Sequence, residues 1–271
     1  MGFSMVASDP ACAKDGEPCA ATQIRDGLMA YEFEPFFQPI VNLADSTLVG
    51  FEALARWRHA ERGLVEPAEF IQIAEANNLI GAIDAVILHR AWRAFDAALL
   101  DCGRPRAPML LSVNLSAANL MDDAVVARIG AMVADRRSPG IQLQLEITET
   151  VMIDDLAQAA SVMKQLRALG VSFALDDFGV GYSSLIYLHR LPIDCIKIDR
   201  SFSEAIMTSP RSRAIVRAII GLADTMELRA VAEGIAKRDV AEALLDLGCP
   251  YGQGLHFGEP VPASGLPARS R

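Results

Sequence analysis

Short apolar runs alternate along most of the chain with longer segments in which apolar residues recur every three or four positions. The short runs are typical of buried β-strands, and the longer period is typical of amphipathic α-helices. Eight runs predict strands, over residues 36–41, 48–57, 109–115, 143–148, 171–175, 195–199, 230–234 and 251–257. The segments between the later runs predict helices, over residues 67–77, 83–99, 122–134, 154–169, 184–189, 215–226 and 240–247.

This order of elements predicts parallel βα units. Eight strands in 271 residues predict an α/β fold of the closed (β/α)₈ TIM-like barrel type. A doubly wound open sheet is the alternative, but the chain lacks the glycine-rich dinucleotide fingerprint that favours it. Only a turn, residues 42–46, joins the first two strands, so we expect the first strand to run antiparallel to the others. Pro39 inside that strand predicts an edge or irregular position, because proline cannot donate a ladder hydrogen bond.

The first part of the chain has no hydrophobic period and is rich in Ala, Asp, Gly and Pro. Residues 1–22 therefore predict an N-terminal tail or linker, and a short helix over residues 23–31 opens a barrel domain covering residues 23–271. No apolar run reaches the roughly 18–20 residues that cross a membrane, and no secretory signal is visible. We expect a cytoplasmic protein without a membrane segment. A linker before the barrel is also compatible with a regulatory domain before residue 23 in the native protein.

Charge and cysteine content narrow the function classes. The net charge of −9 argues against binding long nucleic acid, but a small anionic nucleotide is compatible if metal ions or local Arg and Lys offset the repulsion. Five cysteines at irregular spacing predict reduced thiols rather than a disulfide framework.

One predicted strand ends in two adjacent carboxylates, Asp176 and Asp177, and Gly179 and Gly181 follow in a turn or loop. Neighbouring side chains inside a strand point to opposite faces, whereas at a strand end both can turn into one cleft. Two carboxylates so close repel unless a cation lies beside them. A pair of divalent metals about 3.5–4 Å apart would supply that charge. The alternative is a pair of acids that cap the following helix.

Polar side chains also lie near the ends of the other apolar strands. Taken in order, they are Glu52, Asn114, Glu146, Asp176 with Asp177, Lys197, Glu233 and Gln253. The carboxyl ends of barrel strands converge on one mouth. Oxygen donors favour magnesium or manganese over zinc, and the scattered histidines do not join the set. Separate burial of several unrelated carboxylates would be costly, so the pattern predicts a metal site at the mouth.

These residues resemble the motifs of the EAL family of cyclic di-GMP phosphodiesterases. The resemblance covers about residues 23–262 in family order. The matching segments are Phe37-Gln-Pro-Ile40, Glu52-Ala-Leu54, Ser112-Val-Asn-Leu-Ser116, Glu146-Ile-Thr-Glu149, Asp176-Asp-Phe-Gly-Val-Gly-Tyr-Ser-Ser184, Ile196-Lys-Ile-Asp199, Val231-Ala-Glu-Gly234 and Tyr251-Gly-Gln-Gly254.

The resemblance implies an enzyme that hydrolyses cyclic di-GMP to linear pGpG with two Mg²⁺ or Mn²⁺ ions and that Ca²⁺ inhibits. It implies that a water activated by both ions attacks phosphorus. Lys197, Glu233 and Glu52 form the implied catalytic set, with Lys197 orienting the water or stabilising phosphate charge. The implied ligands of the first ion are Glu52, Asn114, Glu146 and Asp176, and those of the second are Asp176, Asp177 and Glu233.

The implied substrate-binding residues are Gln38, Leu54, Arg56 and Gln253. Arg56 would bind a phosphate, and a surface ion pair is its alternative role. Glu149 would anchor the loop after Asp177, or else it is an exposed acid at a helix start. A homodimer is also implied.

One position departs from the family pattern. The family usually has a second glutamate three residues after Glu233, where this chain has Ala236. This change affects support of the metal site more than the ligands themselves. Two other hypotheses remain open: a catalytically silent cyclic di-GMP receptor, which would be expected to lose metal ligands, and a barrel hydrolase for a different phosphate ester.

Overall fold

The computed structural model describes residues 19–102, 108–135, 140–148, 155–180 and 184–266. Within them, the strands are β1 Phe33–Asn42, β2 Leu48–His59, β3 Gly63–Val65, β4 Met109–Asn114, β5 Ile141–Thr148, β6 Ser172–Phe178, β7 Cys195–Ile198, β8 Arg229–Ala232, β9 Tyr251–Gln253 and β10 Val261–Pro262. The helices are α1 Ala20–Met29, α2 Pro67–Ala76, α3 Ile80–Cys102, α4 Ala117–Leu120, α5 Asp123–Ala134, α6 Leu156–Ala168, α7 Ser184–Arg190, α8 Arg200–Ala205, α9 Pro210–Thr225 and α10 Arg238–Asp246.

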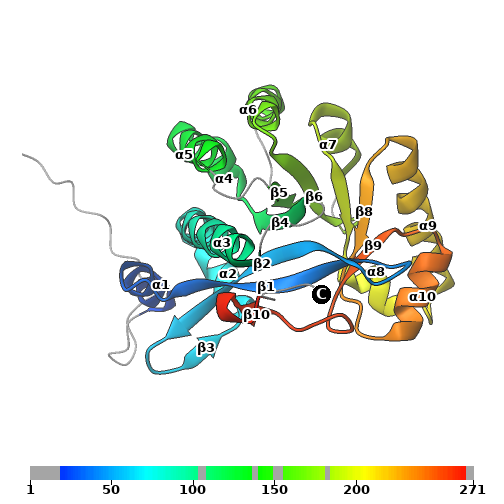
Figure 1. The fold of residues 1–271 in the computed structure, drawn as a ribbon, viewed down its shortest axis with the longest axis horizontal. Helices are drawn as coiled ribbons and strands as arrows, with labels where there is room; N and C mark the ends of the chain where they lie inside the picture. The colour runs from blue at the N-terminus through cyan, green and yellow to red at the C-terminus, as the bar shows by residue number, and fades with distance from the viewer. Residues whose placement is uncertain (1–18, 103–107, 136–139, 149–154, 181–183, 267–271) are drawn as a thin grey trace, which may run out of the picture.

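Eight strands close into the predicted barrel, with helices arranged around its outside (Figure 1). Strands β2 and β4 to β9 are successively parallel. Strand β1 closes the barrel and is antiparallel to both of its barrel neighbours, β2 and β9, which confirms the predicted hairpin. Strands β3 and β10 lie outside this ring and were not predicted, because each is too short to show a hydrophobic period.

The prediction for Pro39 is half right. Strand β1 is not an edge strand, since it pairs with β2 along most of its length. Its other side pairs with β10 at Phe36 and Phe37 and with β9 from Ile40 onward. Pro39 falls between these two pairings, where no ladder hydrogen bond from its nitrogen is needed.

Local sequence signals set several helix ends. Asp122 caps α5 by accepting hydrogen bonds from the backbone N–H groups of Ala124 and Val125 at 2.8 and 3.2 Å. The first helix begins at Ala20, three residues earlier than the sequence predicts, because its first turn contributes only Ala21 to the apolar face. Helices α4 and α8 are too short for their periodicity to have been recognised.

The barrel interior has an apolar layer and a polar layer. A small buried cluster consists of Ile40, Leu110, Ala174, Cys195 and Val231. Three of them, Ala174, Cys195 and Val231, precede the predicted site residues Asp176, Lys197 and Glu233 by two positions, so they share a strand face with the site. This cluster therefore fills the barrel beneath the carboxyl ends of the strands, while the larger apolar core lies between barrel and helices.

The prediction of reduced thiols holds for two of the described cysteines and fails for a third. Cys195 and Cys249 are free, and burial raises the pKa of both thiols to about 12. Cys19 is disulfide-bonded, so the expectation of reduced thiols is wrong for that residue.

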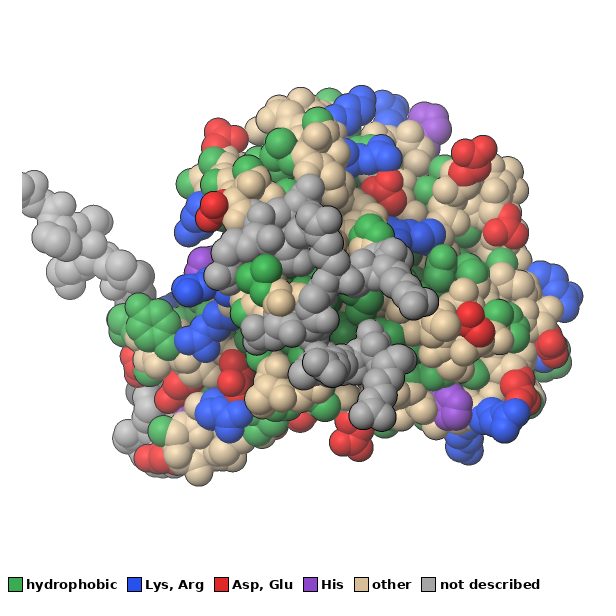
Figure 2. Space-filling model, viewed as in Figure 1, with side chains coloured by type: hydrophobic (Ala, Val, Ile, Leu, Met, Phe, Trp, Pro, Cys, Tyr) green, Lys and Arg blue, Asp and Glu red, His purple; other side chains and the backbone are tan. Residues whose placement is uncertain are grey.

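Acidic and basic side chains are interspersed on the face in Figure 2. None of the helices in the described ranges has the length and apolar character of a membrane span.

Candidate metal centre

A break in strand β6 brings its two aspartates to one side. The strand continues to Phe178, so both aspartates lie inside it, contrary to the prediction that the strand ends before them. Asp177 has a φ of +54°, and the pairing with β7 shifts register between Leu175 and Phe178. This left-handed residue interrupts the alternation of side chains, a conformation that aspartate tolerates better than most residues. Gly179, with a φ of +104°, follows immediately.

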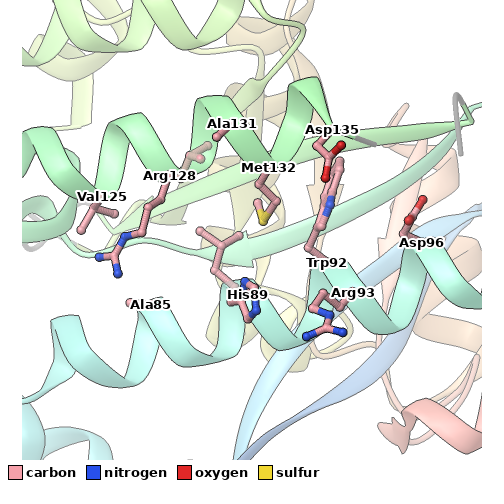
Figure 3. A pocket seen from close by; sticks show the side chains of 12 residues that line it. Ala85, His89, Trp92, Arg93, Asp96, Val125, Arg128, Ala131, Met132 and Asp135 are labelled. Carbon is pink, nitrogen blue, oxygen red and sulfur yellow. The ribbon is translucent and has the colours of Figure 1, made fainter. Parts of the chain in front are cut away.

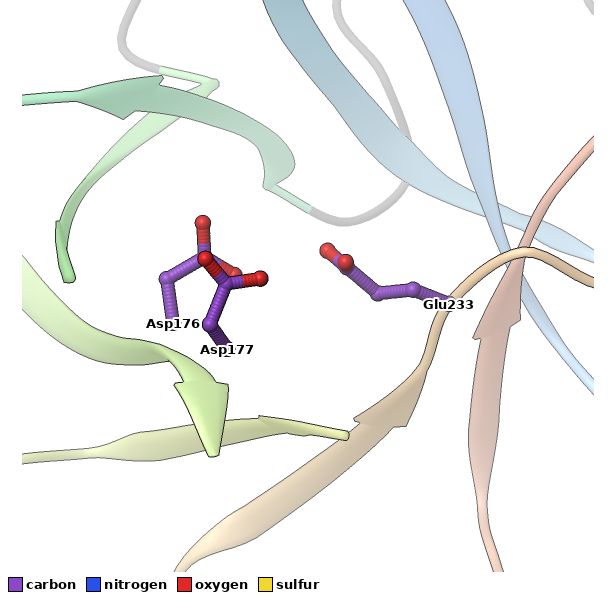
Figure 4. A group of neighbouring side chains, drawn as sticks. All are labelled: Asp176, Asp177 and Glu233. Atoms are coloured by element: carbon purple, nitrogen blue, oxygen red, sulfur yellow. The ribbon is translucent and has the colours of Figure 1, made fainter. Parts of the chain in front are cut away.

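Asp176, Asp177 and Glu233 point toward one another across the gap between the ends of β6 and β8 (Figure 4). One ligand oxygen of each lies within 4.8 Å of the others, close enough to hold one cation. Asp176 is buried, and Asp177 and Glu233 are partly buried. The structure thus brings together the three residues predicted to bind the second metal.

Lys197 lies at the centre of four carboxylates, which include Asp176 and Glu233. Its Nζ atom is 2.6 Å from Glu146 Oε2 and 2.6 Å from Glu233 Oε1. It is 3.2 Å from Asp176 Oδ1 and 3.3 Å from Glu52 Oε2. The lysine side chain is only 2% exposed, so one buried ammonium group holds together acids from four strands or strand ends.

Two amide side chains donate hydrogen bonds to Glu52. Asn114 Nδ2 donates to Glu52 Oε1 at 3.4 Å, and Gln253 Nε2 donates to Glu52 Oε2 at 2.6 Å. The same Gln253 nitrogen donates to Gln38 Oε1 at 2.9 Å. Gln38 lies directly opposite Glu52 in the β1–β2 ladder. Glu52 is therefore a neighbour of Asn114 and of both predicted substrate-binding glutamines.

The electrostatics of the cluster favour added positive charge. Burial raises the pKa of Glu146 well above its ordinary value, and the nearby Glu52 carboxylate adds to this effect. Burial and then Asp176 raise the pKa of Glu233 to about 8, and the same two causes raise that of Asp177 to about 6. For Glu52, Lys197 and the Gln253 hydrogen bond outweigh burial and lower the pKa.

The donor set fits divalent cations. Four carboxylates share the single ammonium group of Lys197, so in their ionised state their four negative charges face one positive charge. Asp176 Oδ1 is buried and, among the described residues, accepts no hydrogen bond, although Lys197 Nζ is near. An unsatisfied buried oxygen in an oxygen-only ligand set is typical of a site for a hard divalent cation.

The remaining predicted residues have mixed outcomes. Arg56 is buried and pairs with the exposed Glu66 at 3.1 Å, so it forms an ion pair but not at the surface, and its guanidinium also lies over the Phe36 ring. Leu54 follows Glu52 on the same face of β2 and is partly buried. Glu149 lies outside the described residues. Ala236 is exposed.

Sequence reasoning missed three polar residues that continue the site into the barrel. Ser112, Gln144 and Arg229 form hydrogen bonds that lead to Glu146. Ser112 and Gln144 precede the predicted residues Asn114 and Glu146 by two positions, so strand alternation places them on the same faces. That spacing is the signal that could have identified them.

A cavity of about 810 Å³ lies away from the mouth, between α3 and α5 (Figure 3). Leu88, Trp92 and Ile129 contribute to its apolar lining, and none of the predicted site residues is part of it. Its charged side chains come from both helices and carry both signs, as with Asp96 on α3 and Arg128 on α5. We therefore do not assign metal binding or catalysis to this cavity, despite its size.

Comparisons with known proteins agree with the geometry at the barrel mouth. Residues 21–260 match the EAL domain family. Cyclic di-GMP phosphodiesterase NbdA from Pseudomonas aeruginosa is 38% identical over 244 residues, which are 90% of this chain and 31% of that protein. Cyclic di-GMP phosphodiesterase RocR from the same organism is 34% identical, over 90% of this chain and 61% of RocR. The chain spans about a third of the length of the first of these relatives.

Solved structures give the same result. The PaMucR phosphodiesterase in complex with c-di-GMP has a TM-score of 0.82 and 34% identity, covering 92% of this chain and 99% of that one. The EAL enzyme Bd1971, bound to cAMP and cyclic di-GMP, has a TM-score of 0.81 and 34% identity over 90% of this chain and 66% of that one. The fold, the ordered motifs and these matches lead to one conclusion: the chain belongs to the EAL domain family.

Proposed function

We propose that this domain is a metal-dependent phosphodiesterase that hydrolyses cyclic di-GMP to linear pGpG. The observation that carries the proposal is the convergence of a full set of oxygen donors on one barrel mouth, where they share a single buried lysine. The relatives named cyclic di-GMP phosphodiesterases support the choice of substrate. A silent receptor is less well supported, because no position in the predicted ligand set has been replaced by a non-ligand residue.

The family resemblance assigns two cation positions to these donors. Glu52, Asn114, Glu146 and Asp176 would hold one ion, and Asp176, Asp177 and Glu233 would hold the other. When bound, two Mg²⁺ or Mn²⁺ ions would lower the pKa of a water molecule and neutralise phosphate charge. Burial raises the pKa values of Glu146, Glu233 and Asp177, and bound cations would favour the ionised forms of these carboxylates.

Lys197 supplies charge that does not depend on a metal. Its neighbouring carboxylates raise its pKa well above the ordinary lysine value, although burial acts in the opposite direction. The ammonium group therefore stays protonated and can donate hydrogen bonds to a water molecule or a phosphate oxygen. In the hydrolysis, one P–O bond breaks, the water oxygen joins phosphorus, and a proton passes to the leaving oxygen.

The proposed substrate contacts lie along β1 and β2 beside Glu52. Arg56 would bind a phosphate of the substrate, with Gln38, Gln253 and the backbone near Leu54 helping to position it. The present partner of Arg56, Glu66, is 59% exposed. Its carboxylate can therefore return to solvent when a phosphate takes its place beside Arg56.

We also propose that the chain forms a homodimer. Val180 and, on α7, Leu185 and Ile186 lie close in sequence and are 58%, 67% and 49% exposed. Large exposed apolar side chains favour a protein interface. We further propose that residues 1–22 are a tail or linker before the barrel domain of residues 23–271, in a cytoplasmic protein that a further domain regulates.

The test is incubation of the purified protein with cyclic di-GMP and Mg²⁺, followed by chromatography. Formation of pGpG that EDTA abolishes supports the proposal. Binding of cyclic di-GMP without turnover in Mg²⁺ or Mn²⁺ would favour the silent receptor instead. Turnover of a different phosphate ester, with none of cyclic di-GMP, would favour the other barrel hydrolase.

A further inference from the structure

Four side chains form a continuous hydrogen-bond chain through the barrel interior, and it ends at Glu146. Arg229, the first residue of β8, donates from Nη2 to Gln144 Oε1 at 2.9 Å. Gln144 donates from Nε2 to Ser112 Oγ at 3.0 Å. Ser112 donates from Oγ to Glu146 Oε1 at 2.5 Å. Ser112 and Gln144 are 0% and 1% exposed, so water does not compete for these bonds.

The chemistry of Arg229 fixes the direction of the chain. Its guanidinium group can only donate. Gln144 must therefore turn its carbonyl toward Arg229 and its amide toward Ser112. The single hydroxyl proton of Ser112 is then directed to Glu146. Each middle residue uses a donor and an acceptor, and reversing any of them would leave a buried group unpaired.

We propose that Ser112 and Gln144 are positioning residues that hold the Glu146 carboxylate in one orientation for cation binding. This inference rests on the proposed function, in which Glu146 is a metal ligand. Oε1 of Glu146 is held by Ser112, and Oε2 is turned toward Lys197 Nζ, 2.6 Å away. Ser112 thus holds Oε1 of Glu146 toward the barrel interior, while Oε2 faces Lys197.

This arrangement also bears on which cation the site prefers. With Oε1 accepting from Ser112, Glu146 presents mainly Oε2 to a cation, and binding through one oxygen suits octahedral Mg²⁺. Ca²⁺ takes more ligands at longer distances and often uses both oxygens of a carboxylate. A carboxylate released from Ser112 could offer both oxygens. Loss of the hydrogen-bond chain should therefore weaken Mn²⁺ or Mg²⁺ binding and reduce discrimination against Ca²⁺.

The test compares Mn²⁺ binding in the full chain without substrate, measured by calorimetry or electron paramagnetic resonance. Ser112→Ala and Gln144→Met break the hydrogen-bond chain at two different points. Ser172→Ala is the matched control, because Ser172 is buried, lies beside Gln144 in the β5–β6 ladder, and donates only to Leu143 O at 3.2 Å among the described residues. Ser112→Thr restores the hydroxyl and tests rescue.

We expect Ser112→Ala and Gln144→Met to raise the Mn²⁺ dissociation constant by about 10–100-fold, the usual effect of removing a partner of a metal ligand. Ser172→Ala should bind Mn²⁺ as the parent does, and Ser112→Thr should recover part of the loss. At saturating Mn²⁺ the first two variants should regain most of the parental kcat. A purely structural role would instead lower stability in EDTA without changing the metal titration.

Parental Mn²⁺ affinity in both Ser112→Ala and Gln144→Met would overturn the inference and leave the proposed function intact. An equal loss in Ser172→Ala would also overturn it, since the effect would then belong to any buried serine in the barrel. If the parent protein bound no Mn²⁺, the proposed function would fail and the inference with it. If Ser112→Ala does not fold, the Mn²⁺ dissociation constant of Gln144→Met alone decides whether the inference stands.

Discussion

Replacing Lys197 with methionine removes the one positive charge among four carboxylates while keeping a side chain of similar length. In the parent protein, the Lys197 ammonium lies 2.6–3.3 Å from acids on β2, β5 and β6 and just after β8. In Lys197→Met these acids face one another without a counter-charge. We expect the metal-free variant to be much less stable than the parent, although the barrel core is unchanged.

The magnitude follows from the burial of the pairs. Removing one partner of a buried ion pair typically costs about 3–5 kcal/mol, because the other charge stays buried and unpaired. For a domain of this size, each kcal/mol shifts Tm by roughly 2–4 °C, which gives a decrease of about 6–20 °C. Protonation of Glu233, whose pKa burial and Asp176 raise to about 8, limits the loss at low pH. The decrease should therefore be larger at pH 9 than at pH 6.

The assay is thermal unfolding in EDTA and in Mn²⁺, at both pH values, for the parent, Lys197→Met and a surface control. Lys164→Met serves as the control, since Lys164 is exposed on α6. Mn²⁺ at 100 times its Kd should return about 2.7 kcal/mol to the variant. An unchanged Tm for Lys197→Met in EDTA at pH 9, or no gain from Mn²⁺, would refute the reasoning that charge balance governs this site.

Three further predictions concern stability, catalysis and the departure from the family pattern. Burial raises the pKa of Asp84 to about 7, so its contribution to stability is present below pH 4 and is lost as pH rises to about 7. Asp84→Asn, which can still accept from Ser116 N–H, should therefore raise Tm at pH 8 and not at pH 4, whereas a pH-independent difference would contradict this. Glu52→Ala and Asp176→Ala should each lower turnover by orders of magnitude while the barrel stays folded by circular dichroism, and near-parental rates in both would contradict the site assignment. Ala236→Glu should raise turnover or Mg²⁺ affinity by at most about 10–100-fold, and identical Mg²⁺ titrations would show that Ala236 is a neutral change.

Strand alternation explains why much of the site could be predicted. Glu52, Glu146 and Lys197 are charged positions inside apolar strands, and a closed barrel brings such positions together whatever their separation in sequence. The antiparallel first strand was also predictable, because five residues cannot form a crossover. These inferences need only the period of each strand and the length of each connection.

Other features depend on geometry that no single segment encodes. The left-handed φ of Asp177 places two neighbouring aspartates in one cleft from within a strand, and local sequence only permits that conformation. The bond between Gln144 and Arg229 joins β5 to β8 across the barrel interior, so it depends on the tilt and stagger of strands that are not adjacent. The same geometry decides which four acids contact Lys197, although strand alternation already predicted that Lys197 lies at the mouth.

The central claim is that the acids around Lys197 hold divalent cations for the hydrolysis of cyclic di-GMP. The most direct measurement is conversion of cyclic di-GMP by the purified chain in Mg²⁺, in Ca²⁺ and in EDTA, with the products separated by chromatography. The account predicts pGpG in Mg²⁺ and almost none in Ca²⁺ or EDTA, because Ca²⁺ does not keep the tight geometry that the two sites require. Equal turnover in all three conditions would contradict it.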